Sequence, residues 1–296
     1  MKKYVKISFI NILIIAILFF ICEFTCIYFS GQINNKDFEY WKYHFFSAIK
    51  SYINTEYFKK DDFRTPTIRN SNKKPLITMG CSYTYGLWLD ENKTFAYVLS
   101  EKTNRSVYNL GVIGTSPREI LYILQNAELR NKLLNNNKNF EYIIYPYISH
   151  HLFRLFIDNK AYTCSPYFRQ TQNGLEFYRK NPIVCNLYTY KKFLELKHSQ
   201  IKNKESFNLF CLYLKEINKE IKKHFNNTKL VILVYEDYIG QDWEILEKEG
   251  IKIVKVANLI NEEIIQPQYT ISATDIHPNE KAWEVIVPKL VEELKL

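Results

Sequence analysis

The sequence predicts an α/β fold: a three-layer α/β/α sandwich around a mostly parallel, flavodoxin-like sheet of five strands. Five short apolar runs, typical of strands buried on both faces, lie at residues 76–79, 107–110, 142–145, 230–235 and 251–256. Segments with apolar residues at helical spacing lie between and after them, at 117–124, 207–225 and 279–296. Strands that alternate with helices form a parallel sheet covered by helices on both faces.

Residues 1–30 predict one transmembrane helix ahead of this domain. Three lysines among the first six residues precede an apolar run over 7–21, which continues with few interruptions to Phe29. Such a stretch is long enough to cross a hydrocarbon layer of about 30 Å. The segment lacks the small-x-small pattern of a cleaved signal peptide, so we expect an uncleaved signal anchor. The lysines place the N-terminus in the cytoplasm and the rest of the chain on the far side of the membrane.

The remaining chain divides into two parts. Residues 31–73 have no clean period, and we interpret them as a juxtamembrane segment that packs loosely against the domain at 74–296. Within that domain, about 152–204 is too long for an ordinary connection and predicts an insertion over the site. Pro117 marks the first turn of a helix, with Ser116 as its N-cap.

Composition limits the partners. Lys and Arg number 40 against 31 Asp and Glu, giving a net charge of +9. The basic residues are scattered through loops and form no cluster, so we expect no nucleic-acid partner. Cys164 and Cys185 bracket a loop-like segment. They pair in an oxidising compartment or are small buried thiols, and the sequence leaves both readings open.

Polar residues follow the predicted strands at the edge where ligands bind in parallel sheets. The stretches are Gly-Cys-Ser-Tyr-Thr-Tyr-Gly at 80–86, Asn-Leu-Gly at 109–111 and Asp-Ile-His-Pro at 275–278. A serine hydroxyl becomes a nucleophile when a base takes its proton and a third group orients the base. Asp275 and His277, two apart in an extended loop, project to the same side. They predict the acid and base that serve Ser82.

Other readings of these residues are structural. Taken singly, Ser82 is also a candidate N-cap of the following helix, and Asp275 is a candidate N-cap of the last one. Cys81 lies beside Ser82 and we expect it to be buried rather than nucleophilic. The elbow of the α/β-hydrolase fold does not match, because that motif needs a glycine where Thr84 stands. No His or Cys pair has metal-like spacing, so we expect neither metal nor cofactor.

The three stretches resemble the conserved blocks of SGNH (GDSL-like) hydrolases, over about residues 75–296. The resemblance implies that Ser82 attacks, that His277 is the general base oriented by Asp275, and that the N–H groups of Ser82 and Gly111 belong to the oxyanion hole. It also implies that the Asn109 side chain lies at the active site, where we expect it to contact substrate. Two departures are a Cys81 where aspartate is usual and an Asp-x-His spacing one residue shorter than usual.

The third block of the family, Gly-x-Asn-Asp, is absent. His150, His151 and Arg154 follow the third strand instead, which resembles a membrane-anchored bacterial subgroup of the family. The resemblance implies that His151 replaces the Asn donor and that Arg154 holds a polar group of the substrate. His150 is the alternative donor, and both histidines being core residues is a further alternative.

The predicted function is that of a serine esterase or O-acyltransferase of the bacterial inner membrane, with its domain on the periplasmic or extracytoplasmic side. We expect its substrate to be an ester, such as an O-acetyl group, on a cell-envelope glycan. The alternative is an inactive member of the fold that binds glycan or acts as an assembly scaffold. A flavodoxin-like phosphate-binding protein is a third reading, but it leaves Asp275 and His277 without a role.

Overall fold

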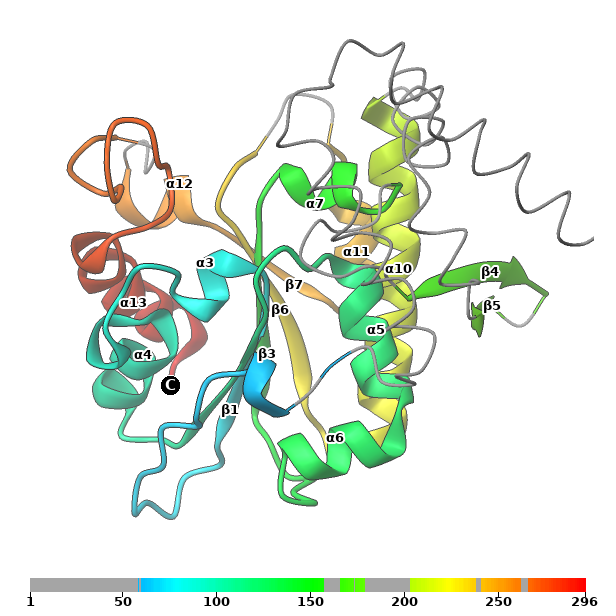
Figure 1. Ribbon diagram of the computed structural model, residues 1–296, viewed down its shortest axis with the longest axis horizontal. Helices are drawn as coiled ribbons and strands as arrows, with labels where there is room; N and C mark the ends of the chain where they lie inside the picture. The colour runs from blue at the N-terminus through cyan, green and yellow to red at the C-terminus, as the bar shows by residue number, and fades with distance from the viewer. Residues whose placement is uncertain are drawn as a thin grey trace, which may run out of the picture.

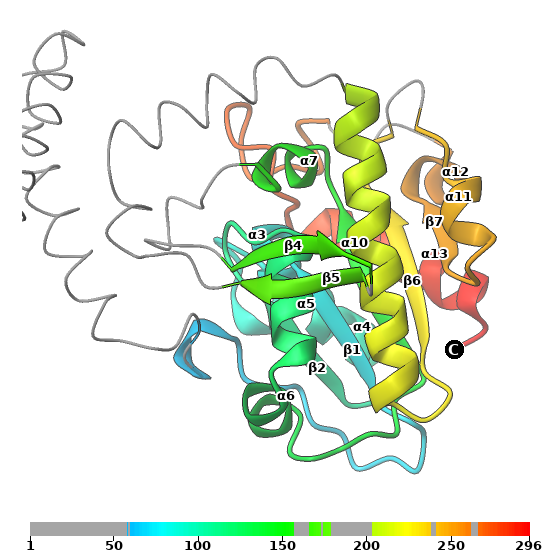
Figure 2. The same cartoon turned by 90° about the vertical axis from the view of Figure 1, so that its right-hand side faces the viewer.

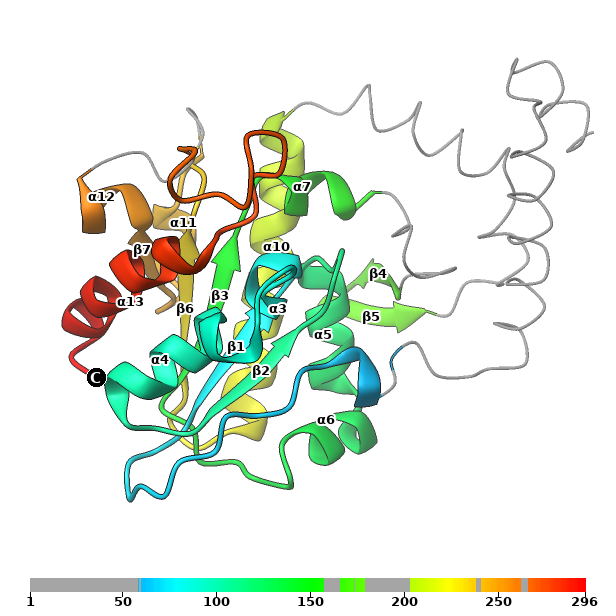
Figure 3. The ribbon, with the colours of Figure 1, turned by 60° about the vertical axis from the view of Figure 1, so that its left-hand side comes forward.

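The computed structural model describes residues 58, 60–156, 166–172, 174–178, 203–237, 241–261 and 266–296. Its centre is a parallel sheet of order β2-β1-β3-β6-β7 (Figure 3). The strands are β1 (Leu76–Gly80), β2 (Val107–Gly111), β3 (Tyr142–Tyr147), β6 (Lys229–Val234) and β7 (Lys252–Lys255). The prediction of a five-stranded parallel sheet is therefore confirmed, and the strand order is that of flavodoxin-like folds.

Helices cover both faces of the sheet, on opposite sides in Figure 1. One layer contains α3 (Ser82–Tyr85), α4 (Phe95–Thr103), α12 (Val256–Ile260) and α13 (Glu280–Leu294). The other contains α5 (Pro117–Gln125), α6 (Ala127–Leu133) and α10 (Asn203–His224). The shorter helices α7 (His150–Arg154) and α11 (Glu244–Glu247) and the 3₁₀ turns η1 (Lys60–Asp62) and η2 (Glu91–Lys93) complete these elements.

The strands are apolar throughout because both of their faces are covered. Every residue of β1 and β2 is buried, and five of the six residues are buried in each of β3 and β6. Two apolar clusters result, one on each face of the sheet: Ile77 belongs to one and Leu76 to the other. Alternate residues of one strand thus supply both cores, which explains why the sequence shows continuous runs and no alternation.

Helix α5 begins where the sequence predicts. The Ser116 side chain accepts from the Arg118 N–H, and the Glu119 carboxylate accepts from the Ser116 N–H at 2.8 Å. This capping box satisfies donors at the helix start. The predicted helix at 207–225 is α10, which begins four residues earlier, and the predicted final helix is α13.

The predicted insertion at 152–204 includes a two-stranded antiparallel hairpin in its described part. Its strands are β4 (Tyr167–Thr171) and β5 (Gly174–Tyr178), which lie across α5 and α10 in Figure 2. Phe168 and Leu175 are its buried side chains and join the core cluster on that face. Cys164 and Cys185 lie outside the described residues, so their pairing stays a prediction.

The described end of the juxtamembrane segment packs closely against the domain, not loosely as predicted. Phe58 and Phe63 are buried in the core cluster. Thr67 pairs with Val107 of β2, donating and accepting one backbone hydrogen bond. Within the described part of the chain, no helix combines the length and apolar character needed to cross a membrane. The predicted transmembrane helix at 1–30 lies outside the described residues.

Gly111 allows the turn of α3 to rest directly on the end of β2. A Cβ at this position would lie 2.4 Å from the Tyr85 backbone nitrogen and 2.7 Å from the Thr84 carbonyl carbon. Backbone atoms cannot swing aside as a flexible side chain can. We expect Gly111→Ala to lower the free energy of unfolding by about 3 kcal/mol, measured by urea denaturation.

Gly250 provides the control. Its φ is +76°, but nothing lies within 4 Å of an added Cβ. Gly250→Ala therefore incurs only the backbone cost of the left-handed conformation, about 1 kcal/mol. Equal losses in the two variants would contradict a steric clash at Gly111.

Candidate active site

The predicted catalytic residues meet at the carboxyl end of the sheet. Ser82 is the first residue of α3, directly after β1, and Cys81 occupies the N-cap position without a side-chain cap bond. Asp275 and His277 lie on the loop that precedes α13, at the same end of the sheet as α3 and α7 (Figure 3). Cys81 is fully buried, as predicted. The alternative that Ser82 is the N-cap of this helix is wrong, because Cys81 occupies that position and the Ser82 hydroxyl bonds to His277.

Two hydrogen bonds join the three residues in one line. Ser82 Oγ lies 2.8 Å from His277 Nε2, and His277 Nδ1 lies 2.5 Å from Asp275 Oδ1. The ionised carboxylate is an acceptor only, so His277 Nδ1 carries the proton and Nε2 is free to accept from the hydroxyl. The arrangement is that of a nucleophile, a general base and an orienting acid. Ser82 is 3% exposed, so its surroundings exclude most of the water.

The carboxylate of Asp275 is kept ionised. Burial by itself raises its pKa, but hydrogen bonds from the His277 backbone N–H and imidazole, and from the Trp88 indole, outweigh this effect. The pKa of Asp275 therefore lies below its ordinary value. A charge that persists below neutral pH can hold the protonated nitrogen of His277 while the imidazole gains a second proton from Ser82.

The loop that carries the pair is closed by its own hydrogen bonds. The Ile271 N–H donates to the His277 carbonyl at 2.9 Å, and Asp275 exchanges backbone bonds with Ser272. Asn279, and not Asp275, is the N-cap of α13, because its side chain accepts from the Ala282 N–H at 3.1 Å. The alternative reading of Asp275 as a helix cap is therefore wrong.

Tyr83 ties the nucleophile to this loop, and sequence reasoning missed it. Its hydroxyl donates to the Ile276 carbonyl at 3.0 Å, between the acid and the base. Its ring lies 5.1 Å from the ring of His277 and packs edge-on against Tyr235. Burial, then the Glu236 charge, raises the pKa of Tyr83 far above its ordinary value, so the phenol keeps its proton and remains a donor. Its position next to Ser82 was the only signal in the sequence.

We expect Tyr83→Phe to lower kcat about three- to tenfold and to change KM less than twofold. The variant keeps the ring but loses one hydrogen bond, a change of about 0.5–1.5 kcal/mol. Tyr235→Phe is the matched control, because the buried Tyr235 hydroxyl has no hydrogen-bond partner in the described structure. Steady-state kinetics with a short-chain ester measure both variants. Equal losses of kcat in the two would show that Tyr83 acts only through packing.

Gly111 and Asn109 bond to each other. The Gly111 N–H donates to Asn109 Oδ1 at 3.0 Å, and Asn109 Nδ2 donates to the Thr84 carbonyl at 3.1 Å. Asn109 is 1% exposed, so its side chain joins the end of β2 to the turn of α3, and this geometry does not support the predicted substrate contact. The Gly111 N–H also has a partner already. The Ser82 N–H, at the start of α3, is the donor that a helix terminus leaves unbonded.

His151 is fully buried in the layer of α5 and α10 and makes no hydrogen bond to Ser82. Its Nδ1 lies 2.6 Å from the Tyr145 hydroxyl and 3.5 Å from the Ile148 nitrogen. A backbone N–H can only donate, so Nδ1 accepts and the proton resides on Nε2. Burial, with the Arg154 charge, holds the pKa of His151 well below its ordinary value, so the ring is neutral.

The Nε2 atom of His151 has no hydrogen-bond partner in the described structure. A buried donor without a partner is uncommon and asks for an explanation. Part of the chemistry predicted for His151 is thus in place: a neutral imidazole, one nitrogen held by a neighbour, and an unused N–H. Donation to an oxyanion stays a prediction. His150, the alternative donor, is exposed.

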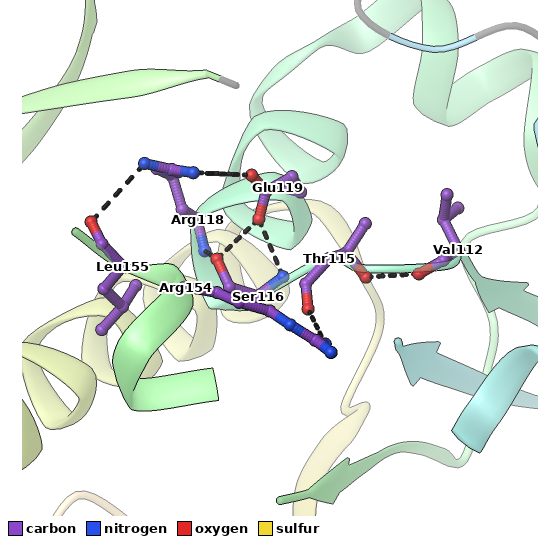
Figure 4. A network of polar contacts seen from close by, with 7 residues as sticks. All are labelled: Val112, Thr115, Ser116, Arg118, Glu119, Arg154 and Leu155. Carbon is purple, nitrogen blue, oxygen red and sulfur yellow. Dashed lines mark hydrogen bonds and ion pairs between the residues drawn. The ribbon is translucent and has the colours of Figure 1, made fainter. Parts of the chain in front are cut away.

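Arg154 lies at the end of α7, where it joins the network of Figure 4. Its Nη1 donates to the Thr115 carbonyl at 3.1 Å. Next to it, Arg118 and Glu119 form a buried ion pair of 3.1 Å, and Arg118 also reaches the Leu155 carbonyl at 3.5 Å. The network pins α7 to the start of α5. The Arg154 guanidinium has five N–H donors, and the bond to Thr115 uses one of them. The predicted contact of Arg154 with substrate stays a prediction.

Glu236, after β6, is a second residue that sequence reasoning missed. It is 9% exposed, and its Oε2 accepts from the Ser149 N–H at 3.0 Å and from the Ser149 hydroxyl. This carboxylate fixes the turn between β3 and α7. It therefore sets where His150 and His151 stand. An isolated Glu after a strand gave no sign of this role.

Comparisons with known proteins add the following. Neither a protein-family model nor a curated protein sequence matches the chain. Among solved structures, an acetyl xylan esterase from the rumen bacterium Butyrivibrio proteoclasticus is similar at TM-score 0.45 and 11% identity, over 76% of this chain and 64% of that one. An extracellular lipase from Streptomyces rimosus gives 0.44 and 8%, over 74% and 99%. AlinE4, a SGNH-hydrolase family esterase, gives 0.41 and 14%, over 76% and 94%. All three TM-scores lie below 0.5, so the function is inferred from the site alone.

Proposed function

We propose that the protein is a serine esterase or O-acyltransferase that forms an acyl intermediate on Ser82. The observation that carries the proposal is the line from Ser82 Oγ through His277 to Asp275, with distances of 2.8 and 2.5 Å. A serine and an Asp–His pair whose histidine lies 195 residues further along the chain rarely align in this order without a catalytic use. A serine activated in this way attacks carbonyl carbon.

The residues divide the reaction between them. As Ser82 Oγ bonds to the carbonyl carbon, its proton passes to His277 Nε2, and the Asp275 carboxylate stabilises the imidazolium. The Ser82 N–H faces the developing oxyanion, and His151 Nε2–H is the proposed second donor. The imidazolium then protonates the leaving alcohol. In the second half, water or a sugar hydroxyl gives its proton to His277 Nε2 and bonds to the acyl carbon. The bond from that carbon to Ser82 Oγ then breaks, and the imidazolium returns the proton to Ser82 Oγ.

The substrate class we propose is an O-acetyl or similar ester on a cell-envelope glycan. The support is the apolar run after the N-terminal lysines, which predicts an anchor that holds the domain outside the cytoplasm. A reporter that is active only outside the cytoplasm, fused after Leu296, should be active. An active cytoplasmic reporter at the same position would exclude the envelope substrate.

A second candidate is a catalytically inactive protein that binds glycan or acts as an assembly scaffold. The observation in its favour is the Gly111 N–H, which is bonded to Asn109 and not free for an oxyanion. A fluorophosphonate probe separates the two, because an activated Ser82 reacts with it and an inactive site does not. Full-length protein should be labelled at Ser82 and should hydrolyse 4-nitrophenyl acetate. Neither labelling nor turnover would favour the scaffold.

A further inference from the structure

Trp88 has an unusual backbone beside the site. Its φ is +69° and the residue is 69% exposed. It stands at the second central position of a β-turn closed by the Leu89 N–H and the Gly86 carbonyl at 3.1 Å. Positive φ at this position usually selects Gly or Asn, and it is an outlier for a bulky residue. A large apolar side chain is thus kept on the surface in a conformation that disfavours it.

Hydrogen bonds from Arg64 hold this turn in place. Arg64 Nη2 donates to the Gly86 and Leu89 carbonyls, at 2.9 Å each, and its Nη1 pairs with Glu91 at 2.8 Å. One guanidinium therefore holds the carbonyls on both sides of Trp88. Unfavourable backbone conformations persist where neighbours hold them in this way, and they cluster at functional sites.

The indole lies near the acid of the triad. The Trp88 side chain lies close enough to the Asp275 carboxylate to lower its pKa. The Leu87 N–H next to it donates to the Ser82 carbonyl at 3.0 Å, which holds this turn beside the nucleophile. Most of Trp88 faces solvent. Trp88 thus lies on the side of His277 and Asp275, and His277 is the group that exchanges a proton with the alcohol oxygen of an ester. A ring on this side is placed to contact the alcohol part of the substrate.

The exposed residues on the two loops that carry Trp88 and Asp275 are mostly polar, with Ile276 as an apolar residue that is 39% exposed on the second loop. Asp90 follows the indole on the first loop and is exposed, and Ser272 and Thr274 are exposed on the second. An acyl chain requires a continuous apolar channel, whereas a sugar ring has an apolar C–H face and hydroxyl groups at its edge. A single indole flanked by carboxylate and hydroxyl groups fits the sugar.

We propose that Trp88 is the platform on which the sugar ring of the ester's alcohol part stacks during the reaction at Ser82. This inference rests on the proposed esterase or acyltransferase function and names the substrate group that Trp88 selects. In the transfer reaction the same platform receives the accepting sugar.

The test compares Trp88→Gly with the parent on two acetate esters. Glycine suits the positive φ, so this variant removes the ring without straining the turn. With full-length protein, we expect kcat/KM for 6-O-acetylglucose to fall about tenfold, mainly through KM, and kcat/KM for ethyl acetate to change less than threefold. Loss of the effect of Trp88 on Asp275 changes both rates alike, so the ratio of the two kcat/KM values isolates the platform. Trp88→Phe keeps an aromatic face and should keep most of the preference for the sugar ester.

Three results would overturn the inference. Equal losses on the two esters would mean that Trp88 acts only through Asp275. A selective loss for ethyl butanoate over ethyl acetate would mean that the indole contacts the acyl chain. If the parent hydrolyses neither ester, the proposed function fails, and calorimetric titration of 6-O-acetylglucose into the parent and Trp88→Gly then decides the platform: equal binding, or none to the parent, rejects it.

Discussion

Ser82→Ala should lower ester turnover by about 10⁴-fold or more, with His277→Ala close behind, because the hydroxyl and the imidazole act as one unit. His277 Nε2 is the base that the structure places against the Ser82 hydroxyl, at 2.8 Å. Asp275→Asn should lose nearly as much, since an amide favours the wrong tautomer of His277. The double variant Ser82→Ala with His277→Ala should be no worse than either single one. Initial rates with 4-nitrophenyl acetate measure all four.

Ser206→Ala is the matched control. Ser206 is buried in α10, in the helix layer on the opposite face of the sheet from α3, and its loss should leave kcat unchanged. Thermal unfolding of each variant excludes a general loss of structure. If Ser82→Ala kept turnover while Cys81→Ala lost it, the thiol would be the nucleophile.

His151→Ala should lower kcat by about 10²-fold, the usual cost of one lost oxyanion donor. The physical reason is the neutral ring, whose Nδ1 is held by Tyr145 and whose Nε2–H has no partner in the described structure. His151→Asn restores an N–H donor and should recover part of the rate. Kinetics at saturating ester, with unfolding followed in parallel, measure the change.

Tyr145→Phe tests whether His151 acts in catalysis or only in packing. It keeps the ring but removes the hydroxyl that lies 2.6 Å from His151 Nδ1 and holds the imidazole in place, so kcat should fall several-fold, in proportion to one lost hydrogen bond. If both His151 variants lost stability and kept kcat, His151 would be a core residue. The oxyanion would then depend on the Ser82 N–H, and the scaffold candidate would gain support.

Arg154 and the network of Figure 4 show how substrate and fold contacts overlap at this edge of the sheet. The guanidinium that the resemblance assigns to substrate also donates to Thr115. Its charge lowers the pKa of His151 and helps to keep that ring neutral. One side chain thus joins the two loops that follow β2 and β3.

The sequence by itself determined the five strands, their parallel arrangement and the chain segments that meet at their carboxyl ends. These features depend on local signals: continuous apolar runs, the capping box at Ser116, and the two-residue spacing of Asp275 and His277. Local signals fix the elements, and the rule that parallel strands align their carboxyl ends then brings Ser82 to the pair.

Only the tertiary structure decided which polar groups at the site already have hydrogen-bond partners and which can still bond to a substrate. The Gly111 N–H is taken by Asn109, and the Ile276 carbonyl is taken by Tyr83 from 193 residues away. The fold also buries His151 completely while it leaves Trp88 exposed beside Asp275. Hydrogen bonds and burial of this kind depend on the positions of segments distant in the chain, to within a few tenths of an ångström. Residue type and spacing carry no information at that precision.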